Sequence, residues 1–180
     1  ALRRHVHALS PDIVIEFYMV SSGLGEVLRH TRIASQFQDI WASDFHYHDN
    51  GEIAFPKNVV SFTDKTRYLF QVAKGIFGPE SRQDPFAVNR KPGPEGIRIP
   101  FDQMIFLGDG YTDVPCFSLV RKHGGVAIGV YGTESRRKWK KAWGFIEDGR
   151  VSNLVRADYG KNASLRDTLL MATERDRKST

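Results

Sequence analysis

The stretch Met104–His123 (MIFLGDGYTDVPCFSLVRKH) constrains the fold more than any other part of the chain. It begins with an apolar run without polar alternation, which is typical of a parallel β-strand covered by helices on both faces. The run ends at Gly108, Asp109 and Asp113 follow four positions apart, and an apolar helical pattern then resumes. The stretch therefore predicts a strand, a tight loop and a helix, with Asp109 at the carboxyl edge of the strand.

Two carboxylates on one short loop can be ligands or turn residues. Open α/β sheets bind ligands at the carboxyl edge of their strands. Carboxylates this close together repel each other unless a hard cation lies between them, and Mg²⁺ is the usual cation beside phosphates. In the alternative interpretation, Asp113 caps the following helix and Asp109 is a turn residue. The rest of the chain has to decide between the two.

Composition sets the broad class. With 180 residues, 41% of them hydrophobic, residues 1–180 are expected to form a single globular domain with a real core. The net charge of +5 arises from 26 Lys and Arg against 21 Asp and Glu, spread widely, and favours no particular partner. The one cysteine, Cys116, excludes an internal disulfide and favours a reducing compartment. The longest apolar run, Ile13–Val20, is too short to span a bilayer, so we expect a cytoplasmic protein and no membrane partner.

The first strand and the turn after it form a second candidate site. Ile13–Val20 predicts a β-strand, which Ser21, Ser22 and Gly23 end before a helical pattern begins at Leu24. The backbone N–H groups of such a strand-to-helix turn face outward and can hold a phosphate. A serine that only caps the helix is the simpler alternative from this segment alone.

A small β-hairpin, which we call the flap, is expected next. The sequence from Trp41 to Pro56 alternates on both sides of Asp49-Asn50-Gly51, a composition typical of a hairpin turn. His46 and His48 lie two apart on one strand face and could share a metal. Exposed histidines explain them better, because the neighbouring sequence offers no third ligand.

Lys65 opens the helix that follows the flap, and the apolar spacing predicts that this helix ends at Gly75. A cation is unfavourable at the positive end of a helix dipole, so its position hints at a bound anion. The next segment, Phe77–Pro100, holds five prolines and predicts an irregular surface connection.

The C-terminal part alternates strands and helices. The patterns predict a buried strand at Gly125–Tyr131, a basic helix at Glu134–Ala142, a short strand at Val151–Val155, and a closing helix at Ser164–Thr173 whose tail frays within residues 161–180. The basic helix carries five cations beside Trp139 and Trp143, a composition that suggests nucleic-acid binding. We favour a solvated face with a tryptophan stripe toward the sheet, and expect no nucleic-acid partner.

Three motifs occur in the order of motifs two, three and four of the haloacid dehalogenase (HAD) superfamily, which this chain resembles. They are Tyr18-Met19-Val20-Ser21-Ser22-Gly23, the helix-opening Lys65, and Gly108-Asp109-Gly110-Tyr111-Thr112-Asp113. Ser21 and Lys65 are 44 residues apart, as are Lys65 and Asp109. The flap looks like that of phosphoserine-phosphatase-type members, and VNRKPGPEGIRIPFDQMIFLGDGYTDVPC with the later ADYG resembles uncharacterised bacterial hydrolases of this superfamily. The resemblance covers nearly the whole chain.

The resemblance implies an α/β fold of the HAD-like Rossmannoid type. This is a three-layer sandwich with a mostly parallel sheet, helices on both faces and a small β-flap. It also implies a Mg²⁺-dependent phosphohydrolase in which an aspartate attacks the phosphorus of a small phosphomonoester, and water then cleaves the aspartyl-phosphate.

The resemblance also implies a role for each motif residue. Asp109 corresponds to the direct metal ligand, and Asp113 to the acidic residue that binds the metal through water or orients the lysine. Ser21, with the N–H groups of the next two residues, would hold a phosphoryl oxygen, and Lys65 would neutralise nucleophile and phosphate together. The implied residues are Lys65, Ser21 and Asp113 for catalysis, Ser21, Ser22, Gly23 and Lys65 for phosphate, and Asp109 and Asp113 for Mg²⁺.

The first motif of the family, Asp-x-Asp-x-Thr after an apolar strand, is absent from these residues. Asp12 precedes its strand, and the other candidates are expected in helix, flap or loop contexts without the paired spacing: Asp39, Asp44, Asp49, Asp64 and Asp84. We therefore expect a C-terminal portion of a hydrolase that lacks the nucleophile and the central first strand and is inactive by itself. The alternative is a non-catalytic HAD-like protein that binds a phosphate or a partner.

The missing strand has a structural consequence. Without it, the strands at Ile13 and Met104 should pair directly, gape, or recruit a strand from another molecule. Exposed edges of buried-type strands favour association, so self-association is expected.

Overall fold

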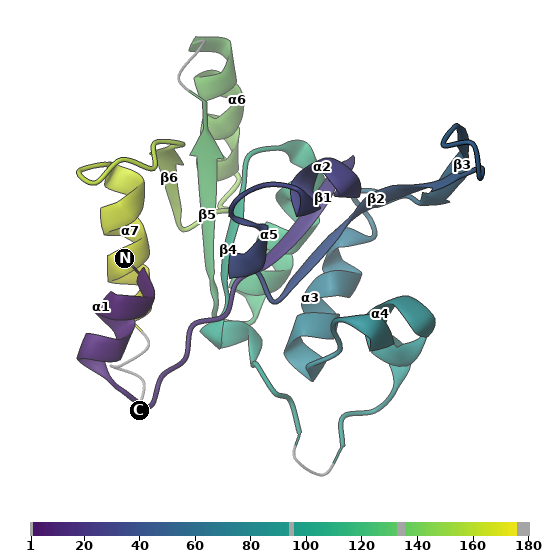
Figure 1. Cartoon of the computed structure of the whole chain (residues 1–180). Coiled ribbons are helices and arrows are strands. Elements are labelled where there is room, and N and C mark those ends of the chain that lie inside the picture. Colours follow the sequence, from purple (N-terminus) through teal and green to yellow (C-terminus); the bar gives the residue numbers. More distant parts are fainter. Residues whose placement is uncertain (1, 94–95, 133–135, 176–180) are drawn as a thin grey trace. The chain divides into compact units, whose positions relative to one another are not determined.

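The computed structural model contains two compact units and describes residues 2–93, 96–132 and 136–175 (Figure 1). Unit 1 comprises Ala1–Ile15 and Pro100–Thr180, and unit 2 comprises Glu16–Ile99. Both units are α/β. The strands of the described residues form two three-stranded sheets, where the sequence predicted one mostly parallel sheet.

Unit 1 alternates strands and helices. Its elements are α1 (Leu2–Leu9), β4 (Ile105–Gly108), α5 (Val114–Lys122), β5 (Val126–Tyr131), α6 (Arg136–Glu147), β6 (Asn153–Arg156) and α7 (Ser164–Arg175), with 3₁₀ turns at Phe101–Gln103 and Tyr111–Asp113. The sheet order is β4-β5-β6 and both ladders are parallel. A helix between consecutive strands returns the chain to the end where the next parallel strand starts. The strand, loop and helix predicted from Met104–His123 are confirmed.

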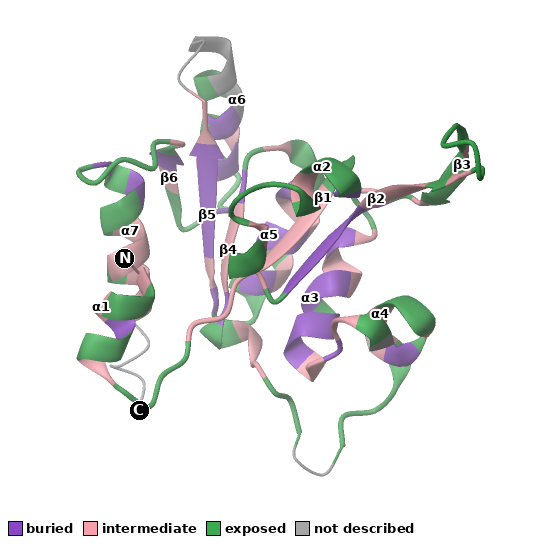
Figure 2. Cartoon of the chain, viewed as in Figure 1, coloured by how far each residue is buried: buried purple, intermediate pink, exposed green. Residues whose placement is uncertain are grey.

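Helices cover both faces of this sheet. Successive strand residues point to opposite faces, so neighbouring residues of β5 contact different helices. On one face, Ala127 packs with Phe117 of α5 and Phe145 of α6. On the other face, Ile128 packs with Leu165 of α7. Figure 2 shows β5 as the most buried strand of this sheet, which explains why its sequence lacks polar alternation.

Unit 2 holds a mixed sheet. Its elements are β1 (Tyr18–Leu24), α2 (Gly25–Arg29), β2 (Asp39–Tyr47), β3 (Ile53–Asn58), α3 (Lys65–Lys74) and α4 (Pro79–Gln83), with 3₁₀ turns at Ala34–Gln36 and Ala87–Asn89. β1 is parallel to β2, and β2 is antiparallel to β3. The predicted flap is confirmed: the N–H of His48 donates to the carbonyl of Glu52 at 2.9 Å, and Gly51 has a φ of 85°. Pro56 lies in the edge strand β3, where a missing N–H is tolerated.

β1 starts five residues later than predicted. Its first residue, Tyr18, pairs with Asp39, the first residue of β2, and just before this pair the N–H of Gln38 donates to the carbonyl of Phe17 at 2.8 Å. Ile13 and Val14 lie outside any strand and are 45% and 79% exposed, so their assignment to the strand was wrong. Among the described residues β1 pairs with β2 and β4 pairs with β5, so the direct pairing of the first strand with the Met104 strand is not observed.

The helix predicted after β1 is also shorter than expected. α2 spans five residues and is followed by a 3₁₀ turn. Leu24, Val27 and Ile33 are 47%, 64% and 56% exposed, so their helical spacing does not mark a buried face.

The proline-rich segment contains the short helix α4 and is not irregular throughout. Asp39 anchors it: this carboxylate is 5% exposed, accepts the N–H of Gly78 at 2.7 Å and forms an ion pair with Arg82. We expected Asp39 in a helix, flap or loop context, and it is instead the buried first residue of β2. The buried Asp39 carboxylate needs such partners because it has lost its hydration, and its contacts hold the segment against β2.

Some expectations concern residues that are not described. The predicted start of the basic helix at Glu134 and the end of the tail beyond Arg175 lie outside the described residues. No helix in the described part of the chain combines the length and the apolar character needed to cross a membrane.

Candidate functional site

The acidic loop of unit 1 lies where the sequence placed it. β4 ends at Gly108, and Asp109 follows at the carboxyl end of this parallel strand with its side chain exposed. α5 begins at Val114, and Pro115 occupies its first turn. Asp109 therefore presents a carboxylate at the sheet edge where α/β proteins bind ligands.

Asp113 is buried, with 4% of its surface exposed, and its side chain turns back into the loop. Its Oδ2 accepts the backbone N–H of Asp109 at 3.0 Å and that of Gly110 at 3.1 Å. Asp113 occupies the N-cap position of α5 but makes no capping hydrogen bond with its side chain, so the predicted cap was wrong. Hydrogen bonds from N–H groups to a carboxylate are charge-assisted, and together they fix the path of the loop around Asp109.

Gly108 is required by the position of Asp113. A Cβ on Gly108 would lie 2.6 Å from both the Cβ and the Cγ of Asp113, far inside normal contact distance. The sequence predicts a tight loop after Gly108, and the structure adds a close approach between the Gly108 backbone and the Asp113 side chain. The spacing of Gly108 and Asp113 in the Gly108-Asp109-Gly110-Tyr111-Thr112-Asp113 motif is the sequence signal that could have indicated this close approach.

The seryl segment of unit 2 differs from the predicted turn. Ser21, Ser22 and Gly23 belong to β1 and not to a strand-to-helix turn. The ladder shifts here: Val20 pairs with Trp41 and Leu24 with Ser43, so four steps along β1 correspond to two along β2. The three residues thus form a bulge, which turns backbone groups out of the ladder.

Two serine hydroxyls organise this bulge. The N–H of Gly23 donates to Oγ of Ser21 at 3.0 Å. The hydroxyl of Ser43 donates to the carbonyl of Ser22 at 3.2 Å and accepts the N–H of Val60 at 3.1 Å. An anion bound by the Gly23 N–H would have to replace the Ser21 hydroxyl. Ser43 was not singled out in the sequence, because its two contacts join segments far apart in the chain.

Lys65 is the first residue of α3 and is 6% exposed. The preceding residue, Asp64, accepts both the hydroxyl of Ser61 at 2.6 Å and its N–H at 3.1 Å. The hydroxyl hydrogen bond holds the pKa of the Asp64 carboxyl below its ordinary value. α3 ends at Gly75 with a φ of 74°, as predicted, and contacts β1. Lys65 and the seryl bulge therefore lie on elements that touch within unit 2.

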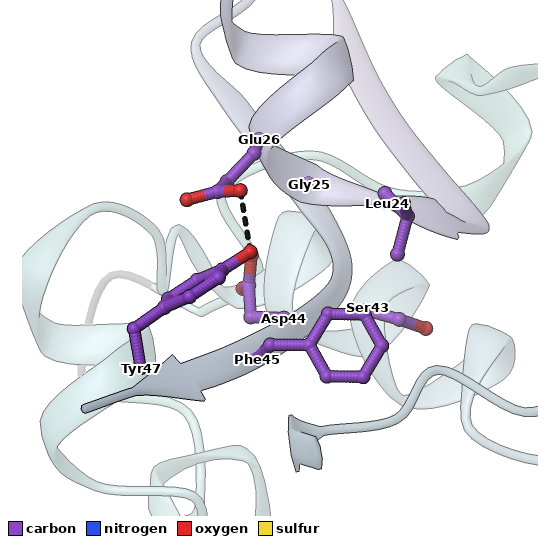
Figure 3. Close-up of a pocket in the computed structure, with 7 residues that line it drawn as sticks. All are labelled: Leu24, Gly25, Glu26, Ser43, Asp44, Phe45 and Tyr47. Carbon is purple, nitrogen blue, oxygen red and sulfur yellow. Dashed lines mark hydrogen bonds between the residues drawn. The ribbon is translucent and has the colours of Figure 1, made fainter. Parts of the chain in front are cut away.

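A small hollow lies beside the seryl bulge (Figure 3). It is lined by Leu24, Gly25, Glu26, Ser43, Asp44, Phe45 and Tyr47. The Tyr47 hydroxyl donates to Glu26 at 2.6 Å, and this hydrogen bond raises the pKa of the phenol, while Asp44 pairs with Arg29. Ser43 belongs both to this hollow and to the contacts that hold the bulge.

The predicted site residues are divided between the two units. Unit 2 carries Ser21, Ser22, Gly23 and Lys65, and unit 1 carries Asp109 and Asp113. Within each unit the neighbouring motif residues lie on contacting elements or on one loop. The convergence of the two groups around one ligand stays a prediction.

The histidines of the flap form no metal site with other ligands in the part of the chain that the structure describes, where no three His, Cys, Asp or Glu side chains come together. His46 is exposed, with its ring centroid 4.9 Å from that of Phe55 and tilted by 37°, and His48 is exposed. The interpretation of these residues as exposed flap histidines is confirmed.

Comparison with known proteins gives one relative of unassigned function. No family model matches the chain, and no solved structure matches it. An uncharacterized protein from Borreliella burgdorferi is 26% identical over 168 residues, which cover 84% of this chain and 55% of that protein. The chain thus spans about half the length of this curated relative.

Proposed function

We propose that the chain belongs to a Mg²⁺-dependent HAD-like phosphohydrolase that acts on a small phosphomonoester. The observation that carries the proposal is the acidic loop. Asp113 uses one carboxylate oxygen to hold two loop N–H groups, while Asp109 stays exposed at the carboxyl end of β4. A turn alone does not need both carboxylates, because a single hydrogen bond would close it.

The residues of the loop fit a hard divalent cation. Asp109 offers the exposed carboxylate oxygens that Mg²⁺ prefers. Asp113 has one oxygen occupied by backbone N–H groups, which suits a ligand that acts through water or orients a neighbour. When bound, Mg²⁺ would neutralise charge on the transferring phosphoryl oxygens.

Phosphate recognition is assigned to unit 2. The bulge at Ser21–Gly23 offers a hydroxyl and outward backbone groups, and a phosphoryl oxygen can take the place of the Ser21 oxygen on the Gly23 N–H. Lys65 adds a positive charge at the N-terminus of α3, where the helix dipole is also positive. Both features favour a dianionic phosphate over a neutral ligand.

The nucleophile must come from outside these 180 residues, since they contain no Asp-x-Asp-x-Thr motif. In the proposed reaction a carboxylate oxygen forms a bond to phosphorus while the bond from phosphorus to the alcohol oxygen breaks, and a general acid protonates the alcohol. Water then attacks the aspartyl-phosphate and releases phosphate. These 180 residues alone are accordingly expected to be inactive.

The absent motif also supports a second candidate. A non-catalytic HAD-like protein would keep the bulge and Lys65 to bind a phosphate-bearing ligand or partner. Phosphate binding by the isolated chain is common to both candidates, so only turnover separates them.

The test compares the 180-residue chain with a protein extended upstream by about one hundred residues, the size of a strand with a small cap. The extended protein is expected to cleave at least one phosphomonoester in Mg²⁺ and to lose activity in EDTA. Asp113→Asn should lower kcat/KM about 10- to 100-fold, and Asp109→Asn at least as much. Asp102→Asn, an exposed acid of the same unit, is the matched control and should leave activity unchanged.

Two results would count against the hydrolase. One is an extended protein without Mg²⁺-dependent turnover of any monoester, which would favour the binding protein. The other is an Asp109→Asn variant as active as the parent, which would remove the acidic loop from the site.

A further inference from the structure

α6 exposes two stacked tryptophans. The rings of Trp139 and Trp143 have centroids 5.3 Å apart and planes at 26°, and the residues are 41% and 42% exposed. They lie four positions apart, one helical turn, so they share one side of the helix. An exposed pair of this size is unusual on a surface and indicates a contact site.

The pair contributes little to the attachment of α6 to the sheet. Ala142 and Phe145, 3% and 2% exposed, pack against Phe117 and Ala127 and supply that attachment. The prediction of a tryptophan stripe toward the sheet was therefore wrong. Truncation of the tryptophans should leave the core of unit 1 intact.

The same helix carries a strong positive charge. Five of the six residues from Arg136 to Lys141 are Lys or Arg, and Glu147 is the one acid of α6. Lys140, next to Trp139, is exposed. A surface of aromatic rings among cations is complementary to a ligand that combines flat rings with anionic groups.

We propose that this surface, formed by Trp139, Lys140 and Trp143, binds single-stranded nucleic acid. A base extends the indole stack from an outer ring face, and the exposed Lys140 contacts a neighbouring phosphate. Base stacking tolerates any sequence because every base has a π-face, so the expected binding is general. The inference is independent of the proposed phosphohydrolase activity.

An anionic membrane surface is a less suitable partner for α6 than single-stranded nucleic acid. The apolar residues that a membrane-surface helix would insert, Phe145 above all, are buried in the core of unit 1. The indole N–H of Trp143 donates to the carboxylate of Glu147 at 3.2 Å, which places a negative charge beside the ring that would enter the headgroups. Stacking of a base uses the ring face and leaves this hydrogen bond undisturbed.

The test is fluorescence anisotropy with a labelled oligothymidylate, long enough to cover a site of about 4–16 nucleotides. The unmodified chain should bind with an affinity that falls as salt rises. Trp139→Ala and Trp143→Ala should each weaken binding about 5- to 150-fold. Lys140→Gln should reduce the slope of log K against log salt by about 0.7.

Tyr159→Ala is the matched control, because Tyr159 is another exposed aromatic of unit 1, 80% exposed, and its loss should not change binding. Circular dichroism should confirm that each variant is folded. Three results would each overturn the proposal. The first is absence of oligonucleotide binding at low salt, and the second is binding that both tryptophan variants retain in full. The third is a change of partner: the tryptophan variants lose binding to phosphatidylserine vesicles, or lose self-association in sedimentation, while their binding of the oligonucleotide is unchanged.

Discussion

Replacement of Gly108 by alanine tests the geometry of the acidic loop most directly. The added Cβ would lie 2.6 Å from the Cβ and Cγ of Asp113 and 2.7 Å from its Oδ2. Ordinary contact begins at 3.4 Å, so Asp113 would have to move by roughly 0.8 Å, the difference between 3.4 Å and 2.6 Å. Its Cβ cannot move this far without the backbone, and the two hydrogen bonds to the loop would lengthen or break.

The expected cost combines two terms. Overpacking costs about 1–3 kcal/mol, and weakened hydrogen bonds to a charged acceptor add to it, so we expect a loss of about 2–4 kcal/mol in the free energy of unfolding. With a urea m-value of about 2 kcal/mol per M, the middle of the usual range, the midpoint of unfolding should fall by roughly 1–2 M. The amide protons of Asp109 and Gly110 should also exchange faster with solvent.

Gly110→Ala is the matched control on the same loop. Gly110 has extended backbone angles, φ −143° and ψ 173°, and the nearest atom to an added Cβ, Oγ1 of Thr112, is 3.8 Å away. Alanine should therefore fit, and the smaller entropy of the unfolded chain should stabilise the protein by about 0.4–1 kcal/mol. The two substitutions thus have opposite predicted signs.

Equal urea midpoints for Gly108→Ala and Gly110→Ala would refute this geometry. A double-mutant cycle gives a second criterion. In an Asp113→Ala background, Gly108→Ala should cost less than in the parent, since two of the three close atoms are gone. Strict additivity of the two changes would show that Gly108 and Asp113 do not touch.

Two further predictions concern unit 2. Asp39→Ala removes the acceptor for the Gly78 N–H and the partner of Arg82, so urea unfolding should show a loss of about 1–3 kcal/mol; an unchanged midpoint would show that α4 does not depend on this carboxylate. Ser61→Ala removes the hydroxyl that lowers the pKa of Asp64, so an NMR titration should find that pKa closer to its ordinary value. Because the folded pKa lies below the unfolded one, the stability lost in Ser61→Ala should be present above the unfolded pKa and vanish as pH falls through the folded pKa. A difference that persists at low pH would contradict this linkage.

Several elements could be predicted because their signals are local. Asp49-Asn50-Gly51 predicts the flap turn, and Gly75 marks the end of α3, since both glycines have a positive φ that other residues rarely adopt. The buried strand after Gly125 follows from an apolar run with no alternation, which reflects burial on both faces.

The failures have non-local causes. Ile13–Val20 has the composition of a strand, but among the described residues its ladder with β2 begins only at Tyr18, opposite Asp39. The seryl bulge depends on a shift in register against β2. Trp139 and Trp143 share a stripe of α6, and so do Ala142 and Phe145. The sequence pattern allows either stripe to face the sheet, and only packing against Phe117 selects the second.

For the acidic loop, the residue types alone establish the place of the loop and the kind of ligand that it could take. They do so because carboxylates, glycines and an apolar run act through short-range preferences of the backbone and through their own chemistry. The direction of the Asp113 side chain was open, since N–H groups lie both behind it in the loop and ahead of it in α5. In the folded chain the Asp113 side chain points back into the loop, where Gly108 leaves room for the carboxylate and two N–H groups donate to one of its oxygens.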